Sequence, residues 1–170
     1  MAVPFSQLTI PVFLRGLENL NHILRKAQSQ SALPGGEPDR LVQARLAANM
    51  YPLSGQVQAA SDAAKACVGR LSGHQIPRFA DTETTFEELL ARIAKTIDFI
   101  GTVRPDQIDT DVDGEIELAL PSGSVVLSKH DYIFKLALPN FYFHLTTAYA
   151  ILRNQGVELG KSDYLGRLTA

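Results

Sequence analysis

His144 is the residue of this sequence whose type and position best suit chemistry. It lies within residues 138–156, LPNFYFHLTTAYAILRNQG, whose apolar spacing predicts one helix that begins at Pro139 and ends at Gly156. At about 100° per residue, His144 falls at the edge of the apolar stripe, which consists of Phe141, Leu145, Ala148 and Leu152. An imidazole at such an edge can bind a ligand, move a proton or coordinate a metal.

Two amides are candidate partners for His144. Asn140 lies one helical turn earlier, so both side chains can reach one point. Gln56, in another predicted helix, has a comparable angle to its own apolar stripe. If the two helices face each other, these residues form a small ligand-binding pocket inside the protein. The alternative is a buried histidine that is merely hydrogen-bonded by Asn140, Gln56, a tyrosine hydroxyl or a backbone carbonyl.

The sequence offers few metal ligands. It contains neither H-x-x-x-H nor H-E-x-x-H, and amides bind transition metals poorly. We therefore predict no cofactor. The alternative is a divalent transition metal such as zinc or nickel, and His144 is then the candidate ligand. Cys67 belongs to an apolar helical stripe and is predicted to be a core residue. His22, His74 and His130 fit surface, loop or capping positions.

Composition excludes several classes of protein. The 170 residues suit a single domain, 1–170, and the formal net charge of -2 argues against nucleic-acid binding. The apolar runs are too short to cross a membrane, and the amino-terminal residues do not resemble a signal peptide. The single cysteine cannot form an internal disulfide. These features predict a cytoplasmic protein.

Helical periodicity predicts four long helices. They run from about Gln7 to Gln28, from Pro52 to Gly73, from a cap at Thr84 to about Ile100, and from Pro139 to Gly156, with a short helix at Asp39–Asn49. Pro11 is tolerable only near the first turn. Thr84 and Glu87 match a capping box, and Glu88 and Arg92 can pair on the outer face.

Between the third and fourth long helices the period changes. EIELAL alternates polar and apolar residues, PSGS supplies a turn and VVLS follows, which predicts a β-hairpin at about 115–128. Ser128 and Asp131 then suggest a short capped helical turn, and the tail after Gly156 lacks periodicity. The predicted fold is all-α, a four-helix bundle with this hairpin inserted. Aromatic residues encircle the last helix, which favours a homodimer; they are Phe141, Tyr142, Phe143 and Tyr149.

Three segments of the sequence resemble a known family. They are MYPLSGQVQAASDAAKACVGRLSG, DTETTFEELLARIAKTIDF and LPNFYFHLTTAYAILRNQGVELGKSDYLG. They look like an uncharacterised bacterial domain of unknown function within the DinB/YfiT-like superfamily of metalloenzymes. The resemblance implies a four-helix bundle, often dimeric, with up-down-down-up connectivity.

The same resemblance implies where a metal would lie. Metal-binding members of the superfamily use one histidine on the second helix and an H-x-x-x-H pair on the last. By this resemblance His144 matches the second histidine of the pair, Asn140 stands at the first, and the helix 2 position falls near Gln56. Only one of three ligands is present, so the site is degenerate.

Three functions remain open on these grounds. The leading hypothesis is a cytoplasmic homodimer with a small-ligand pocket, or a vestige of one, around His144. The first alternative is a metal-dependent hydrolase or thiol transferase of the DinB/YfiT type. The second is a non-catalytic interaction protein whose hairpin or tail contacts a partner.

Overall fold

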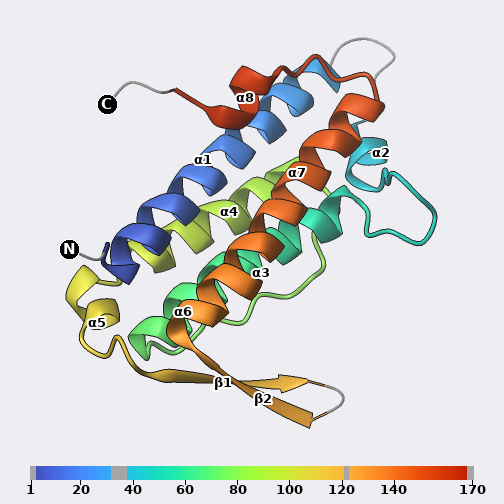
Figure 1. Cartoon of the computed structure of the whole chain (residues 1–170). Helices are drawn as coiled ribbons and strands as arrows, with labels where there is room; N and C mark the ends of the chain where they lie inside the picture. The colour runs from blue at the N-terminus through green and yellow to red at the C-terminus, as the bar shows by residue number, and fades with distance from the viewer. Residues whose placement is uncertain (1–2, 32–37, 121–122, 168–170) are drawn as a thin grey trace.

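The computed structural model describes residues 3–31, 38–120 and 123–167, and this part of the chain is mainly helical (Figure 1). In chain order the elements are α1 (Phe5–Ser31), α2 (Pro38–Val42), α3 (Leu53–Ser72), α4 (Phe86–Gly101), α5 (Pro105–Asp109), β1 (Glu115–Leu120), β2 (Gly123–Ser128), α6 (Lys129–Asp131), the π-helical turn η1 (Tyr132–Ala137), α7 (Leu138–Asn154) and α8 (Lys161–Leu165). The predictions of a mainly helical fold and of a hairpin at about 115–128 are confirmed. Residues 32–37 of the predicted loop and residues 121–122 of the predicted turn lie outside the described residues.

The core lies between the long helices, with α3 packed against α7 and α4, and α1 packed against α4. Its fully buried members come from all four; they include Phe13, Leu17, Leu20, Val57, Ala60, Ala64, Leu89, Ile93, Phe141 and Ala148. Phe13 and Phe141 meet edge to face with ring centroids 5.0 Å apart. Gly16 makes this contact possible, because a Cβ there would lie 2.5 Å from Cε1 of Phe141.

The first helix is longer than predicted. It begins at Phe5, so Pro11 lies inside the helix rather than near its first turn. Pro11 and Gln7 are both exposed, so water can hydrate the Gln7 carbonyl that the proline leaves without its helical donor. The amino end is held by Asp109 of α5, whose carboxylate accepts from the Ser6 backbone N–H (3.0 Å) and hydroxyl (2.5 Å).

The predicted short helix at Asp39–Asn49 is shorter than expected, because α2 ends at Val42. The chain then turns, and the Arg45 guanidinium donates to the carbonyls of Ala48 (3.5 Å) and Met50 (3.3 Å). Backbone turn bonds, such as Met50 N–H to the Ala47 carbonyl (3.0 Å), together with these side-chain bonds replace the helical ladder in this segment. The following helix α3 agrees with its prediction and ends at Gly73, which has φ 74°.

The start of α4 differs from its prediction by one residue. The sequence contains two overlapping T-x-x-E frames, and the structure uses Thr85 with Glu88 rather than Thr84 with Glu87. Thr85 Oγ1 accepts from the Glu88 N–H (3.2 Å), and the Glu88 carboxylate accepts from the Thr85 N–H (3.1 Å). This frame makes Phe86 the first helical residue and buries it. Packing of the helix on the core, not the cap motif, selects between the two frames.

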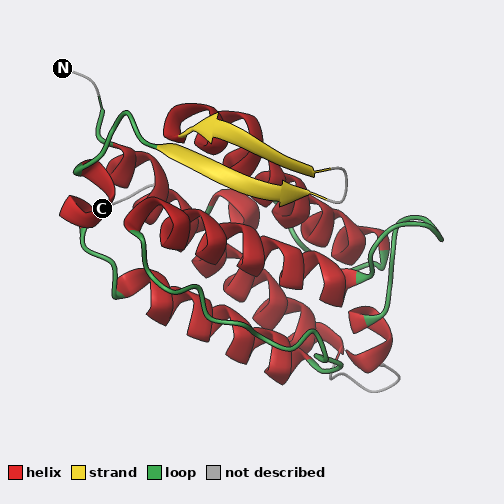
Figure 2. Ribbon diagram, turned by 90° about the horizontal axis from the view of Figure 1, so that it is seen from below, coloured by secondary structure: helices red, strands yellow, loops and turns green. Residues whose placement is uncertain are grey.

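The hairpin confirms its predicted position and lies along the helices in Figure 2. Leu118 pairs with Val125 and Ile116 with Leu127, so the apolar residues of the alternating pattern share one face. Ile116 and Leu118 are buried on that face, whereas Glu117 is exposed. The Ser128 hydroxyl accepts from the Asp131 N–H at 3.1 Å, as its predicted cap requires.

The last long helix does not begin at Pro139. Helical structure already starts at Lys129 and passes through the π-helical turn η1 into α7 without a break. The wider π turn leaves room for the Pro139 ring, which would otherwise clash with the preceding turn. The predicted end is confirmed: Gly156 has φ 86°, and the Val157 N–H donates to the Leu152 carbonyl at 3.0 Å.

The tail folds back through α8 and docks on α1 (Figure 1). Asp163 is the central contact, because its carboxylate binds the Lys26 ammonium (3.0 Å) and the His22 Nε2 (3.1 Å). A backbone hydrogen bond from Gly160 is the main cause that lowers the pKa of Asp163 to about 2, with Lys26 and His22 adding to it. His22, predicted to be a surface residue, is exposed and anchors the tail.

Candidate functional site

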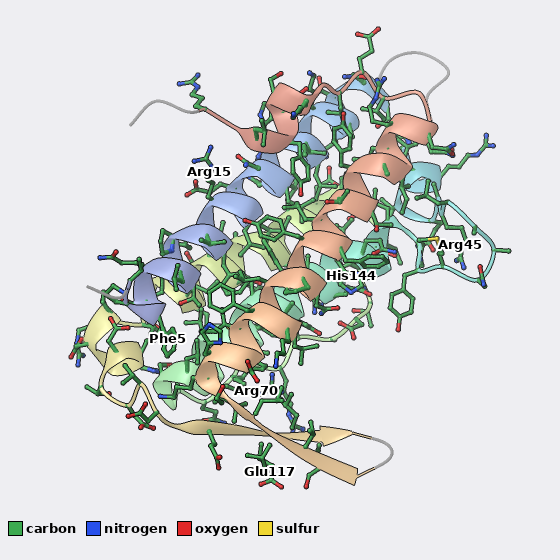
Figure 3. The ribbon with its side chains drawn as sticks, viewed as in Figure 1. Phe5, Arg15, Arg45, Arg70, Glu117 and His144 are labelled. Carbon is green, nitrogen blue, oxygen red and sulfur yellow. The ribbon has the colours of Figure 1, made fainter. Side chains whose placement is uncertain are left out.

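The structure brings His144 and Gln56 into direct contact. His144 projects from α7 on the side that faces α3 (Figure 3), and its Nδ1 lies 2.7 Å from Oε1 of Gln56. Both side chains are nearly hidden, with 9% of His144 and 1% of Gln56 exposed. The contact joins residues 88 positions apart in the sequence, at the predicted interface of two helices.

A second hydrogen bond fixes the orientation of Gln56. Its Nε2 donates to the Tyr51 carbonyl at 3.2 Å, so its Oε1 is the atom that faces the imidazole. A carboxamide oxygen only accepts, and Nδ1 of His144 must therefore carry the hydrogen. It follows that Nε2 of His144 holds a lone pair in the neutral ring.

Burial keeps the imidazole neutral. Desolvation lowers the pKa of His144 below its ordinary value of 6.5. Among the described residues, every buried side-chain nitrogen or oxygen has a hydrogen-bond partner. Gln56 contacts only Nδ1, so we infer that Nε2 is the ring nitrogen that reaches solvent. A neutral imidazole with an accessible lone pair can accept a hydrogen bond or a proton.

Asn140 and the remaining histidines lie elsewhere. Asn140 is exposed on the first turn of α7 and takes no part in the buried contact between His144 and Gln56. Nδ1 of His74 lies 3.0 Å from the Ser72 hydroxyl at the end of α3. His130 is exposed at the start of α6, with its ring centroid 4.7 Å from that of Phe134.

The donor set around His144 does not fit zinc or nickel. One imidazole nitrogen is available, and the facing amide oxygen already accepts the Nδ1 hydrogen. Within residues 3–31, 38–120 and 123–167, no three His, Cys, Asp or Glu side chains gather as a metal site.

Two aromatic residues that contact His144 or Gln56, one through its ring and one through its backbone carbonyl, have solvent-exposed side chains. Phe143 is 56% exposed, and its ring packs edge to face on the His144 ring with the two ring centroids 5.2 Å apart. Tyr51, whose carbonyl holds Gln56, is 63% exposed. Tyr51 also lines a hollow of about 510 Å³ beside the start of α3, which continues past Asp62 to Glu83. Exposed aromatic surface beside a partly hidden polar group is typical of binding sites.

The predicted outer-face pair of Glu88 and Arg92 is wrong. The Arg92 side chain is 1% exposed and binds the carboxylates of Asp62 (2.7 Å), Asp81 (2.9 Å) and Glu83 (2.9 Å). Nε of Arg92 also donates to the Ser61 hydroxyl at 3.2 Å. This arginine ties the connector before α4 to α3. Helical periodicity could not reveal the burial of Arg92, because the residues that cover its side chain come from outside α4.

Cys67 has the predicted core position. Its side chain is fully buried in α3, and burial raises the pKa of its thiol to about 12, with the Arg70 charge acting weakly in the opposite direction. A thiol of this kind is not a nucleophile near neutral pH.

Comparison with known proteins gives the family. The family model described as Domain of unknown function (DUF1993) matches residues 5–165. The chain belongs to the DUF1993 family. No curated protein matches it in sequence. A crystal structure of a DinB family member protein from Shewanella denitrificans is similar, with 38% sequence identity over 98% of this chain and 94% of that chain and a TM-score of 0.90. The DUF1993 domain therefore has a DinB-like fold.

In this DUF1993 protein the Gln56 amide bonds the His144 imidazole directly. No helix in the described part of the chain combines the length and apolar character that a membrane span needs.

Proposed function

We propose that this DUF1993 protein binds a small organic ligand at His144, and that the ligand donates a hydrogen bond to Nε2. The observation that carries the proposal is the hydrogen bond from Nδ1 of His144 to Gln56, which is itself fixed by Tyr51. It sets the tautomer and orients the free nitrogen before any ligand arrives.

The surroundings favour binding over catalysis. The exposed ring of Phe143, which packs against His144, supplies apolar area for a ligand, and the imidazole supplies one polar contact. Hydrolysis or thiol transfer of the DinB/YfiT type would need a divalent metal and further ligands that His144 lacks. The cytoplasm remains the proposed location, since the single cysteine is a buried free thiol.

Histidine NMR tests the first step of the proposal. Long-range ¹H–¹⁵N spectra of the purified protein should show His144 as the Nδ1–H tautomer at neutral pH, with a pKa below 6.5. Gln56→Ala should remove the preference for this tautomer. A His144 ring that titrates normally and exchanges between tautomers in the wild type would contradict the proposed geometry.

A fragment screen tests binding itself. Phenols, amides and alcohols should be screened by saturation-transfer NMR against protein purified without a nickel column. Hits should shift the Nε2 resonance of His144, and His144→Ala should abolish them, whereas His130→Ala, a control at an exposed histidine, should retain them. Elemental analysis of the same samples, which measures bound zinc and nickel, tests the alternative of a metal-dependent enzyme. Stoichiometric zinc or nickel that disappears in His144→Ala would overturn the proposal in favour of a metalloenzyme.

We also propose that the protein is a homodimer built as an up-down-down-up four-helix bundle. The packing of α3 against both α4 and α7 supports the bundle. Large exposed apolar side chains on η1 and β2 support a second copy; they are Phe134, Leu136 and Val126. Light scattering during size-exclusion chromatography should give twice the chain mass. Phe134→Glu should give the monomer mass, and a monomeric wild type would refute the dimer.

A further inference from the structure

A second hollow lies on the opposite side of α7 from His144, between α1, α7 and the docked tail. It measures about 370 Å³, within the usual range for small-molecule sites. Its lining is largely apolar and comes from all three segments; it includes Pro11, Val12, Tyr142, Leu145, Tyr164 and Leu165. Tyr142 and His144 are about 200° apart around the helix, so this hollow is separate from the proposed site at His144.

The tail segment that lines the hollow is hydrogen-bonded to both α1 and α7. The Asn19 amide on α1 donates to the Tyr164 carbonyl at 3.0 Å. The Tyr164 hydroxyl lies 2.8 Å from that of Thr146 on α7, and its ring packs edge to face on Tyr149. Helix α8 also carries the Asp163 contact to Lys26. The tail segment is therefore tied to both long helices, which keeps the hollow preformed.

One cationic side chain lines this hollow. Figure 3 shows Arg15 projecting from α1 toward the tail segment. Its Nη2 donates to the exposed carbonyls of Leu165 (2.8 Å) and Arg167 (3.3 Å). No carboxylate in the described part of the chain lies within ion-pair distance of it. Because those two bonds use only Nη2, Nη1 and Nε remain as donors for a ligand.

The hydroxyl of Tyr142 lies within the electrostatic influence of Arg15. Burial, with the nearby Tyr164, raises the pKa of Tyr142, and the Arg15 charge opposes this rise. The guanidinium of Arg15 and the phenol of Tyr142 therefore both line this mainly apolar hollow. A guanidinium forms strong charge-assisted hydrogen bonds with carboxylates, and Nη1 or Nε of Arg15 can each donate one.

We infer that this hollow binds a small carboxylic acid with an apolar body, whose carboxylate pairs with Arg15 while the body contacts Leu145, Tyr142 and Tyr164. The inference does not depend on the proposed site at His144.

Titration with octanoate, followed in ¹H–¹⁵N spectra, tests the inference. The amides of Gly16, Asn19, Leu145 and Leu165 should shift, and 1-octanol, which lacks the charge, should bind at least about tenfold more weakly. Arg15→Gln should weaken octanoate binding to a similar extent. Arg25→Gln, at an exposed arginine of the same helix, should leave it unchanged, as should His144→Ala.

Each of three results would overturn the inference: no saturable shift with octanoate, equal binding of 1-octanol, or equal binding to Arg15→Gln. A folded spectrum of Arg15→Gln is required for the comparison. If that variant does not fold, Val12→Trp, which places a ring in the hollow, should block octanoate instead, and undiminished binding would count against the inference in the same way.

Discussion

Replacement of Arg92 by methionine should destabilise the protein by about 3 kcal/mol. The guanidinium is the charged group at the centre of a network that joins α3, α4 and the connector between them. It binds Asp62, Asp81 and Glu83 and lies with its carbon Cζ 5.5 Å from the Phe79 ring centroid. Methionine retains most of the buried aliphatic stem but removes every hydrogen bond and the charge.

The magnitude follows from how far each acidic partner can return to water. Removal of one partner from a buried ion pair costs about 3–5 kcal/mol. Asp62 and Asp81 are 46% and 58% exposed, so water can solvate them once the arginine is gone. Glu83 is 11% exposed and is left in a poor environment. One stranded carboxylate rather than three places the loss at the lower end of that range.

Urea unfolding followed by far-UV circular dichroism measures the change in free energy of unfolding. Arg104→Met is a matched control, because Arg104 pairs with Asp106 at the surface, where the two side chains are 68% and 65% exposed. The control should lose less than about 1 kcal/mol. If Arg92→Met loses no more than this control, the network does not stabilise the fold and the reasoning fails.

The pH dependence gives a second check on the same network. Burial alone would raise the pKa of Glu83, but hydrogen bonds from Arg92 and Gln58 outweigh it, so the pKa lies below its ordinary value of 4.5. A lowered pKa in the folded state stabilises the protein above pH 4.5, and that stability disappears as the pH falls through the lowered value. The gap in stability between wild type and Arg92→Met should therefore narrow in acid.

Three other predictions concern packing, helix capping and the cysteine; the first two are measured by urea unfolding. Gly16→Ala should cost about 1–3 kcal/mol in urea unfolding, because its methyl group would overlap the Phe141 ring; an unchanged midpoint would contradict the close packing. Thr85→Ala should cost about 1 kcal/mol and Thr84→Ala less, since only Thr85 caps α4; the reverse order would refute the observed frame. The Cys67 thiol, with a pKa of about 12, should react with a disulfide reagent only after unfolding; rapid reaction of the native protein would disprove its burial.

Part of the site could be predicted from sequence, because helical rotation is a local property. The angles of Gln56 and His144 to their apolar stripes placed both at the edge of a helix interface, and the structure brings them into contact. The same reasoning grouped Asn140 with them, yet its side chain is exposed. A helical angle states which residues share a face; it does not state how far a neighbouring helix covers that face.

The sequence by itself determined the signals that act within a few residues. They are the apolar stripes, the glycine ends of α3 and α7, and the alternation of the hairpin, each of which depends on backbone geometry close in the chain. The tertiary structure decided which T-x-x-E frame caps α4, that a π turn leads into Pro139, and that the tail docks on α1. It also buried Arg92. The physical reason is that the burial of a polar side chain depends on carboxylates and packing residues from distant segments of the chain. Local periodicity contains no information about which distant residues come into contact.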